Sequence, residues 1–259
     1  MTIQFQESAA EPIACEPRAE QFYGDALRDL TIAGIPFLLA GTYAVAAYTG
    51  ITRKTKDIDI FCRPVDYPRI LALFRSLGYY TEVEDPRWIA KVWKGKHFFD
   101  VIFASSNLAV PITDSWFEDA RNTEVLGTVA KMVGPTELIW SKVFVQNRDR
   151  YDGADVAHVI LTLRDEIDWR RLLTHMDAHW EVLLTHLVLF RWFYPSERDA
   201  VPGWVMAELT QRLQADLTVG SSAERICRGR MFSKADYEID VSEWGYSDPL
   251  GEYPKTHGQ

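Results

Sequence analysis

The sequence predicts an α/β protein in which a mixed-sheet core is followed by a mainly helical region. Two observations predict this class. Up to about residue 134, short apolar and β-branched runs alternate with amphipathic segments of helical period. From residue 135 to about 194, helical periodicity continues with breaks near 151–153 and 165–168. A chain of 259 residues with 47% hydrophobic residues can form a core of this kind.

The first half alternates helical and strand patterns. A helix over 19–33 has apolar residues at helical spacing and ends at Gly34, and a helix over 68–77 ends in the same way at Gly78. A turn at Lys94-Gly95-Lys96 joins two strands into a hairpin. The other elements expected here are strands over 36–40, 57–62, 79–83, 88–93 and 98–103, a helix over 43–50, and a short hairpin over 124–126 and 129–133.

The second half begins at Gly134-Pro135-Thr136-Glu137, which predicts a helix start because proline is well tolerated in the first turn. A later helix is expected over 204–217. These patterns predict four parts: a flexible N-terminal tail over 1–18, an α/β core over 19–134, a helical region over 135–218 and an irregular C-terminal segment over 219–259.

Composition narrows the class of protein. No apolar run approaches the length of a membrane span, and the N-terminus lacks a signal-peptide pattern. Cys15, Cys62 and Cys227 are scattered without C-x-x-C pairing, which argues against a disulfide framework or a zinc site. We therefore expect a cytoplasmic protein without a membrane partner. The net charge of −9, from 28 basic and 37 acidic residues, weakens a polynucleotide substrate without excluding one.

The most informative segment is the turn at Gly41 and Thr42 with the acidic pair Asp57 and Asp59 that follows it. Residues two apart on a strand leave the same face, roughly 7 Å from each other. Carboxylates this close repel, and a divalent cation such as Mg²⁺ removes the repulsion. A helix starting at this turn directs N–H groups at an anion, and glycine lets a phosphate approach the main chain. The segment therefore predicts metal-dependent nucleoside triphosphate chemistry.

Asp100 is the only acid in the apolar run 98–103. Buried carboxylates are usually paired or metal-bound, so the alternative to a metal ligand is a salt bridge to a nearby Lys or Arg. Four cations precede it at Arg87, Lys91, Lys94 and Lys96. They either line the metal site or protect an edge strand, and the sequence leaves both open.

These residues, in this order, resemble the DNA-polymerase-β-type nucleotidyltransferase superfamily, whose signature is a small turn followed by Asp-x-Asp. The form Arg53-x-Thr55-x-Asp57-x-Asp59 is most similar to the branch with abortive-infection toxins of the AbiEii type and small-molecule-modifying relatives. That branch adds a lysine and a D-x-x-D motif, for which this chain has Lys142 and Asp152-Gly153-Ala154-Asp155. The resemblance covers about residues 30–160. It departs at Thr42, where Gly or Ser is usual.

The resemblance implies a polymerase-β-like mixed sheet and an enzyme that transfers a nucleoside monophosphate from ATP or another triphosphate to a hydroxyl acceptor, releasing pyrophosphate. It implies that Asp57, Asp59 and Asp100 are catalytic and bind Mg²⁺, with Mn²⁺ as an alternative. The nucleotide-binding residues that it implies are Gly41, Thr42, Arg53, Thr55, Lys142 and Asp155. For Asp152 and Asp155, a surface ion-pair cluster is an equally weighted alternative.

Several alternatives stay open at this stage. The acceptor can be a small hydroxylated molecule, an RNA such as tRNA, or a protein, and a cognate antitoxin can be a partner. A different class of function is a catalytically degenerate fold that serves as a nucleotide- or partner-binding module. Retention of all three carboxylates argues against such a module.

Overall fold

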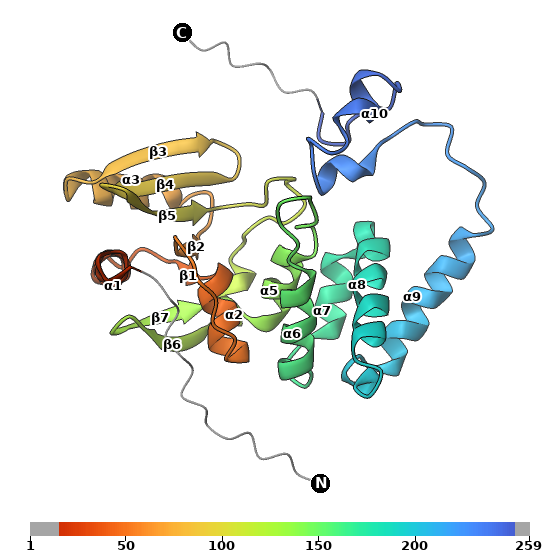
Figure 1. The fold of residues 1–259 in the computed structure, drawn as a ribbon, viewed down its shortest axis with the longest axis horizontal. Helices are drawn as coiled ribbons and strands as arrows, with labels where there is room; N and C mark the ends of the chain where they lie inside the picture. The colour runs from red at the N-terminus through yellow and green to blue at the C-terminus, as the bar shows by residue number, and fades with distance from the viewer. Residues whose placement is uncertain (1–15, 252–259) are drawn as a thin grey trace. The chain divides into compact units, whose positions relative to one another are not determined.

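The computed structural model describes residues 16–251 (Figure 1). The chain forms two compact units, the first ending at Leu138 and the second beginning at Ile139. Of the tail expected over 1–18, residues 1–15 lie outside the described residues, and a helix already begins at Pro17. The end of the irregular C-terminal segment, from residue 252, also lies outside them.

The first unit is built on one seven-stranded mixed sheet in the order β3-β4-β5-β2-β1-β7-β6. Its strands are β1 (Leu38–Leu39), β2 (Asp59–Phe61), β3 (Tyr80–Asp85), β4 (Ile89–Lys94), β5 (His97–Ile102), β6 (Arg121–Val125) and β7 (Thr128–Met132). The β2–β5 and β1–β7 pairs are parallel, and the other neighbouring pairs are antiparallel. The predicted mixed α/β class is thereby confirmed.

Among the described residues of this unit, from 16 to 138, the helices that begin are α1 (Pro17–Ile32), α2 (Gly41–Thr49), α3 (Tyr67–Ser76), α4 (Ser115–Glu118) and α5 (Pro135–Lys142). α1 buries Phe22, Leu27 and Leu30, as its periodicity predicts. The hydroxyl of Tyr23, also on α1, donates to the carbonyl of Lys56 at 2.7 Å. This hydrogen bond fixes the loop that leads to the acidic pair. α5 continues across the boundary between the two units.

The second unit is mainly helical. Its helices are α6 (Gly153–Leu163), α7 (Trp169–His175), α8 (Trp180–Phe193), α9 (Gly203–Asp216) and α10 (Glu238–Ser242). α8 packs against both α6 and α9 (Figure 1). Leu183, Leu187 and Phe190 on it are fully buried. The breaks predicted near 151–153 and 165–168 separate α5 from α6 and α6 from α7. Among residues 16–251, no helix is both long and apolar enough to span a bilayer.

Two predicted boundaries next to the acidic pair are wrong. The strand expected over 57–62 begins only at Asp59, so Asp57 precedes it. The hydroxyl of Thr55 bonds to the carbonyl of Asp57, and such local bonds compete with strand pairing. The helix expected over 43–50 begins two residues earlier, at Gly41, because Gly41 adopts a φ of +56° that permits a sharp turn out of β1.

Candidate active site

A row of charged side chains crosses the sheet of the first unit. Asp59 on β2 is the register partner of Asp100 on β5, which in turn is the partner of Lys91 on β4. Lys91 is the partner of Glu82 on β3. Directly paired residues on neighbouring strands project from the same face, so these four side chains share one face of the sheet. The two predicted metal ligands Asp59 and Asp100 are therefore neighbours.

Gly41 lies against the side chain of Asp59. A Cβ atom built on Gly41 would lie 1.7 Å from Asp59 Oδ2, and the φ of +56° is itself unfavourable for any other residue. The backbone also pairs here, since Ala40 N–H donates to the carbonyl of Asp59 at 3.0 Å. The glycine thus makes room for an acidic side chain beside the first turn of α2. The positive end of the helix dipole favours a carboxylate at this position.

Asp57 is held by its own loop. The hydroxyl of Thr55 lies 3.0 Å from the carbonyl oxygen of Asp57 and 3.1 Å from its Oδ1. Asp57 is half-buried and is followed by the fully buried Ile58, whose carbonyl accepts from Asp100 N–H at 3.0 Å. The charge of Asp57 acts on Asp100 strongly enough to help raise its pKa. Sequence reasoning gave Thr55 a nucleotide-binding role, whereas its described contacts orient Asp57.

Asp100 is paired with a lysine. Lys91 Nζ lies 3.1 Å from Asp100 Oδ1 and 3.0 Å from Glu84 Oε2, so one ammonium group bridges two carboxylates. Burial raises the pKa of Asp100 above its ordinary value; Lys91 opposes this, and the charges of Asp57 and Glu84 add to it. The salt bridge that the sequence left open as an alternative for Asp100 is therefore present.

The oxygen donors of Asp57, Asp59 and Asp100 are of the kind that a hard divalent cation prefers. The ammonium group of Lys91 beside Asp100 shows that this position already attracts a cation. Across residues 16–251, however, no three His, Cys, Asp or Glu side chains are gathered closely enough to hold one ion together. Asp59 and Asp100 are strand neighbours, but Asp100 Oδ1 contacts Lys91. The three carboxylates are thus suitable ligands for a divalent cation, but Asp100 already forms a salt bridge with Lys91.

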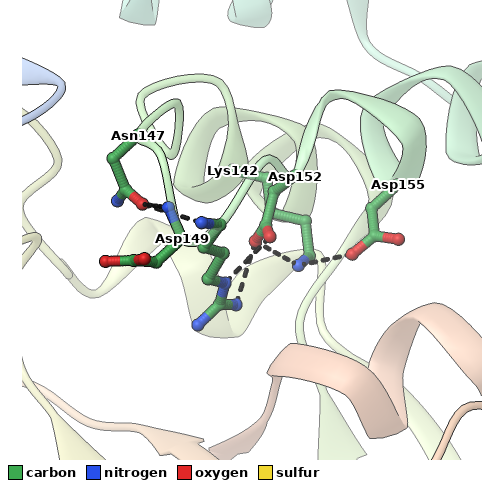
Figure 2. A network of polar contacts seen from close by, with 6 residues as sticks. Lys142, Asn147, Asp149, Asp152 and Asp155 are labelled. Carbon is green, nitrogen blue, oxygen red and sulfur yellow. Dashed lines mark hydrogen bonds and ion pairs between the residues drawn. The ribbon is translucent and has the colours of Figure 1, made fainter.

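Lys142 and Asp155 belong to a buried network in the second unit, shown in Figure 2. Lys142 Nζ donates to Asp152 Oδ2 at 2.8 Å and to Asp155 Oδ2 at 2.9 Å, and the three side chains are 5%, 8% and 6% exposed. An ammonium group has three N–H donors, so one remains for another partner. The equally weighted alternative of a surface cluster is wrong in one respect, because these ion pairs are buried.

Arg150 completes this network. Its Nε and Nη2 each donate at 2.9 Å to a different oxygen of Asp152, a two-point contact that Lys cannot make. Burial alone would raise the pKa of Asp152, but the bonds from Arg150 and the charge of Lys142 outweigh it and leave that pKa below its ordinary value. The side chain of Asn147 shapes the intervening loop by accepting from the N–H groups of Asp149 and Arg150.

The two remaining predicted residues belong to the first unit. Thr42 is the second residue of α2 and half-buried, and Arg53 is exposed in the loop before Thr55. Of the nine predicted site residues, seven thus lie in the first unit, and Lys142 and Asp155 lie in the second.

Sequence reasoning did not assign Lys91 to Asp100, nor Arg150 to Asp152. A signal for the first was present. The two-residue turn at Gly95 and Lys96 fixes the register of the β4–β5 hairpin, which places Lys91 directly opposite Asp100. For Arg150, the spacing of two residues from Asp152 predicts no particular contact.

The sequence profile of one protein family, described as "Nucleotidyl transferase of unknown function (DUF2204)", matches residues 19–182. The chain belongs to this family. The match confirms the resemblance to nucleotidyltransferases, and it spans every candidate residue of this DUF2204 chain, from Gly41 to Asp155. No curated protein matches the sequence significantly.

Several solved structures are similar to this DUF2204 chain. The antibiotic-resistance factor ANT(2″)-Ia in complex with adenylyl-2″-tobramycin has 16% identity and a TM-score of 0.43, over 68% of this chain and 99% of that one. The lincosamide antibiotic adenylyltransferase LnuA, bound to lincomycin, has 16% identity and a TM-score of 0.40, over 56% and 96%. JHP933 from Helicobacter pylori has 11% identity and a TM-score of 0.40, over 88% and 99%. Similarity this low says nothing of the acceptor of the present protein.

Proposed function

We propose that this protein transfers a nucleoside monophosphate from a nucleoside triphosphate to a hydroxyl acceptor, with Mg²⁺ as the metal and Mn²⁺ as a substitute. One observation carries the proposal: Asp59 and Asp100 are paired across β2 and β5, and Asp59 lies against Gly41 at the start of α2. Paired carboxylates supply ligands for a cation, and a helix N-terminus supplies N–H groups for a phosphate. A metal–triphosphate complex needs both. Membership of a nucleotidyltransferase family supports the general reaction.

In this proposal, Asp57 and Asp59 hold the metal ions and Asp100 completes the set. When bound, the ions neutralise the charge that develops on the attacking and leaving oxygens. The acceptor hydroxyl oxygen forms a bond to the α-phosphorus as its proton passes to solvent water, the bond from that phosphorus to the bridging oxygen breaks, and pyrophosphate leaves. Thr55 orients Asp57, and the first N–H groups of α2 at Gly41 and Thr42 face the phosphates.

The cationic side chains have proposed roles as well. We assign Arg53 to the charge of the leaving pyrophosphate, and Lys142 and Asp155 keep the nucleotide-binding role that the family resemblance implies for them. Asp152 and Asp155 then act by orientation, since both already hold the ammonium group of Lys142. The third N–H donor of Lys142 is the one available to a phosphate oxygen.

We place the acceptor among small hydroxylated molecules, and the enzyme in the cytoplasm. The net charge of −9 favours a cationic small molecule over a polynucleotide. Cys62 and Cys227 are buried free thiols, as a reducing compartment allows. tRNA or protein acceptors and a cognate antitoxin partner are the alternatives that an acceptor and partner screen would reveal.

The decisive test is calorimetric titration of ATP, GTP, CTP and UTP into the full-length protein, with Mg²⁺ and with EDTA. The proposal predicts binding of at least one triphosphate with Mg²⁺ only, and loss of that binding in an Asp57→Asn/Asp59→Asn variant of unchanged fold by circular dichroism. Well-folded wild-type protein that binds no triphosphate would contradict it. That result would favour the degenerate binding module.

Asp100→Asn separates catalysis from binding. Because Asp100 is proposed to complete the site at the acceptor oxygen, the substitution should abolish transfer while triphosphate affinity changes by less than about threefold, roughly 0.6 kcal/mol. Transfer is followed by pyrophosphate release and affinity by the same calorimetry. An unchanged transfer rate would remove Asp100 from the mechanism.

A further inference from the structure

The bridging position of Lys91 is not explained by the reaction proposed above. Lys91 is a mostly buried cation, 16% exposed, on the same face of the sheet as Asp59 and Asp100. Its ammonium group neutralises Asp100, the carboxylate that is proposed to complete the metal site. A cation placed on a proposed metal ligand either prevents metal binding or is displaced by it.

Glu84 provides the place to which Lys91 can be displaced. Glu84 Oε2 lies 3.0 Å from Lys91 Nζ on the side of β3, away from Asp59 in the strand order. Its side chain is half exposed, so it can follow the ammonium group at little cost. Lys91 Nζ also lies 4.5 Å from the centroid of the Phe98 ring, which offers a further stabilising contact for the cation.

We infer that Lys91 is a displaceable counter-ion: it neutralises Asp100 until a divalent cation enters, and it then remains with Glu84. The inference rests on the proposed function, because it presupposes a metal site at Asp57, Asp59 and Asp100. It adds a residue that sets how tightly this site binds a cation. It also explains why, among the described residues, Asp57, Asp59 and Asp100 are not close enough together to bind one metal ion while Lys91 is paired with Asp100.

The test is Mn²⁺ binding to the full-length protein without nucleotide, measured by the loss of the free-ion signal in electron paramagnetic resonance. Lys91→Met keeps most of the side-chain volume and removes the competing charge. It should raise Mn²⁺ affinity about tenfold, the scale of one unit charge acting close to a partly buried site. Glu84→Gln should act in the opposite direction and lower the affinity about threefold, because Lys91 then has only Asp100 as an anionic partner.

Lys96→Met is the matched control. It removes the same charge from the same hairpin, but Lys96 is 72% exposed and pairs with Glu16 at 2.8 Å. Its Mn²⁺ affinity should equal that of the wild type. A purely structural role for Lys91 predicts a lower melting temperature of Lys91→Met with unchanged affinity, and that result would overturn the inference. Glu84→Gln keeps the inference testable if Lys91→Met does not fold.

The outcomes distinguish this inference from the function on which it rests. Binding lost in Asp57→Asn/Asp59→Asn but unaffected by Lys91→Met and Glu84→Gln would overturn the counter-ion role alone. Mn²⁺ binding that survives in Asp57→Asn/Asp59→Asn, or that is absent from both wild type and Lys91→Met, would overturn the inference by removing its metal site. The triphosphate titration then decides the proposed function separately.

Discussion

At the scale of single residues, Gly41 determines whether Asp59 can occupy its position. The sequence suggested that this glycine lets a phosphate approach the backbone. The structure adds a second demand, because the space that a Cβ atom would fill is already taken by the Asp59 carboxylate. One residue thus serves the turn, the helix start and the acidic side chain.

Gly41→Ala should therefore abolish Mg²⁺-dependent triphosphate binding. The methyl group would force Asp59 away from its position, and the left-handed φ adds a strain of about 1–2 kcal/mol. Gly50→Ala is the matched control at the other end of α2, where φ is +70° and no atom lies within 4 Å of the added Cβ. It should show a similar loss of stability in urea but normal binding in calorimetry. Equal binding by both variants would contradict the role of Gly41.

At the scale of elements, the α5–α6 connection is organised around a buried cation. Lys142 near the end of α5 and Asp155 in the first turn of α6 are joined through their side chains, and Asp152 precedes α6. Breaking a buried ion pair leaves uncompensated charge, which costs far more than losing a surface pair. A loss of activity on mutation of Lys142 can therefore reflect folding as well as chemistry.

Lys142→Met should lower the free energy of unfolding by about 3–5 kcal/mol, because two buried carboxylates lose their common partner. Arg148→Met serves as the control. Arg148 lies in the same connection and pairs with Asp236, but it is 84% exposed, so its loss should cost about 0.5 kcal/mol. Urea unfolding measures both. Comparable effects would show that the Lys142 network contributes no more than a surface contact.

The positions of the helices and strands along the chain were largely predictable, whereas the order of the strands in the sheet was not. Periodicity and glycine stops located α1, α3 and α9 to within about two residues. The position of β1 between β2 and β7 depends on long-range pairing that a strand of two residues does not encode. For the same reason the sequence could indicate Asp59 and Asp100 as candidates but could not say that they are register partners on β2 and β5.

At the scale of the whole molecule, two histidines with lowered pKa values, the buried His186 and the half-buried His179, link stability to pH. His186 is 3% exposed, and its Nε2 lies 2.9 Å from both the Val143 carbonyl and Gln146 Nε2. Burial lowers its pKa below the ordinary value of 6.5, and burial with the charge of Arg228 lowers the pKa of His179. A lowered histidine pKa means that the unfolded chain binds the proton first.

The free energy of unfolding should therefore fall as the pH decreases below about 6.5, by at most about 1.4 kcal/mol per pH unit for each histidine. Above that pH the stabilising contribution of neutral His186 is fully present. His186→Gln, which stays neutral, should show a shallower decline between pH 6.5 and 5 in urea titrations. Between pH 7.5 and 9 the two proteins should run parallel, and an unchanged slope at low pH would contradict the assignment.

The β4–β5 hairpin has a consequence for the order in which the chain folds. Lys91 and Asp100 are nine residues apart, whereas Asp59 joins Asp100 only through a parallel pairing that closes a much longer loop. Short-range pairings close at lower entropic cost and form earlier. We therefore expect Asp100 to acquire its lysine before it meets Asp59. The later pairing of β2 with β5 would then bring together two acidic strands of which one is already neutralised, so that the chain needs no metal ion in order to fold.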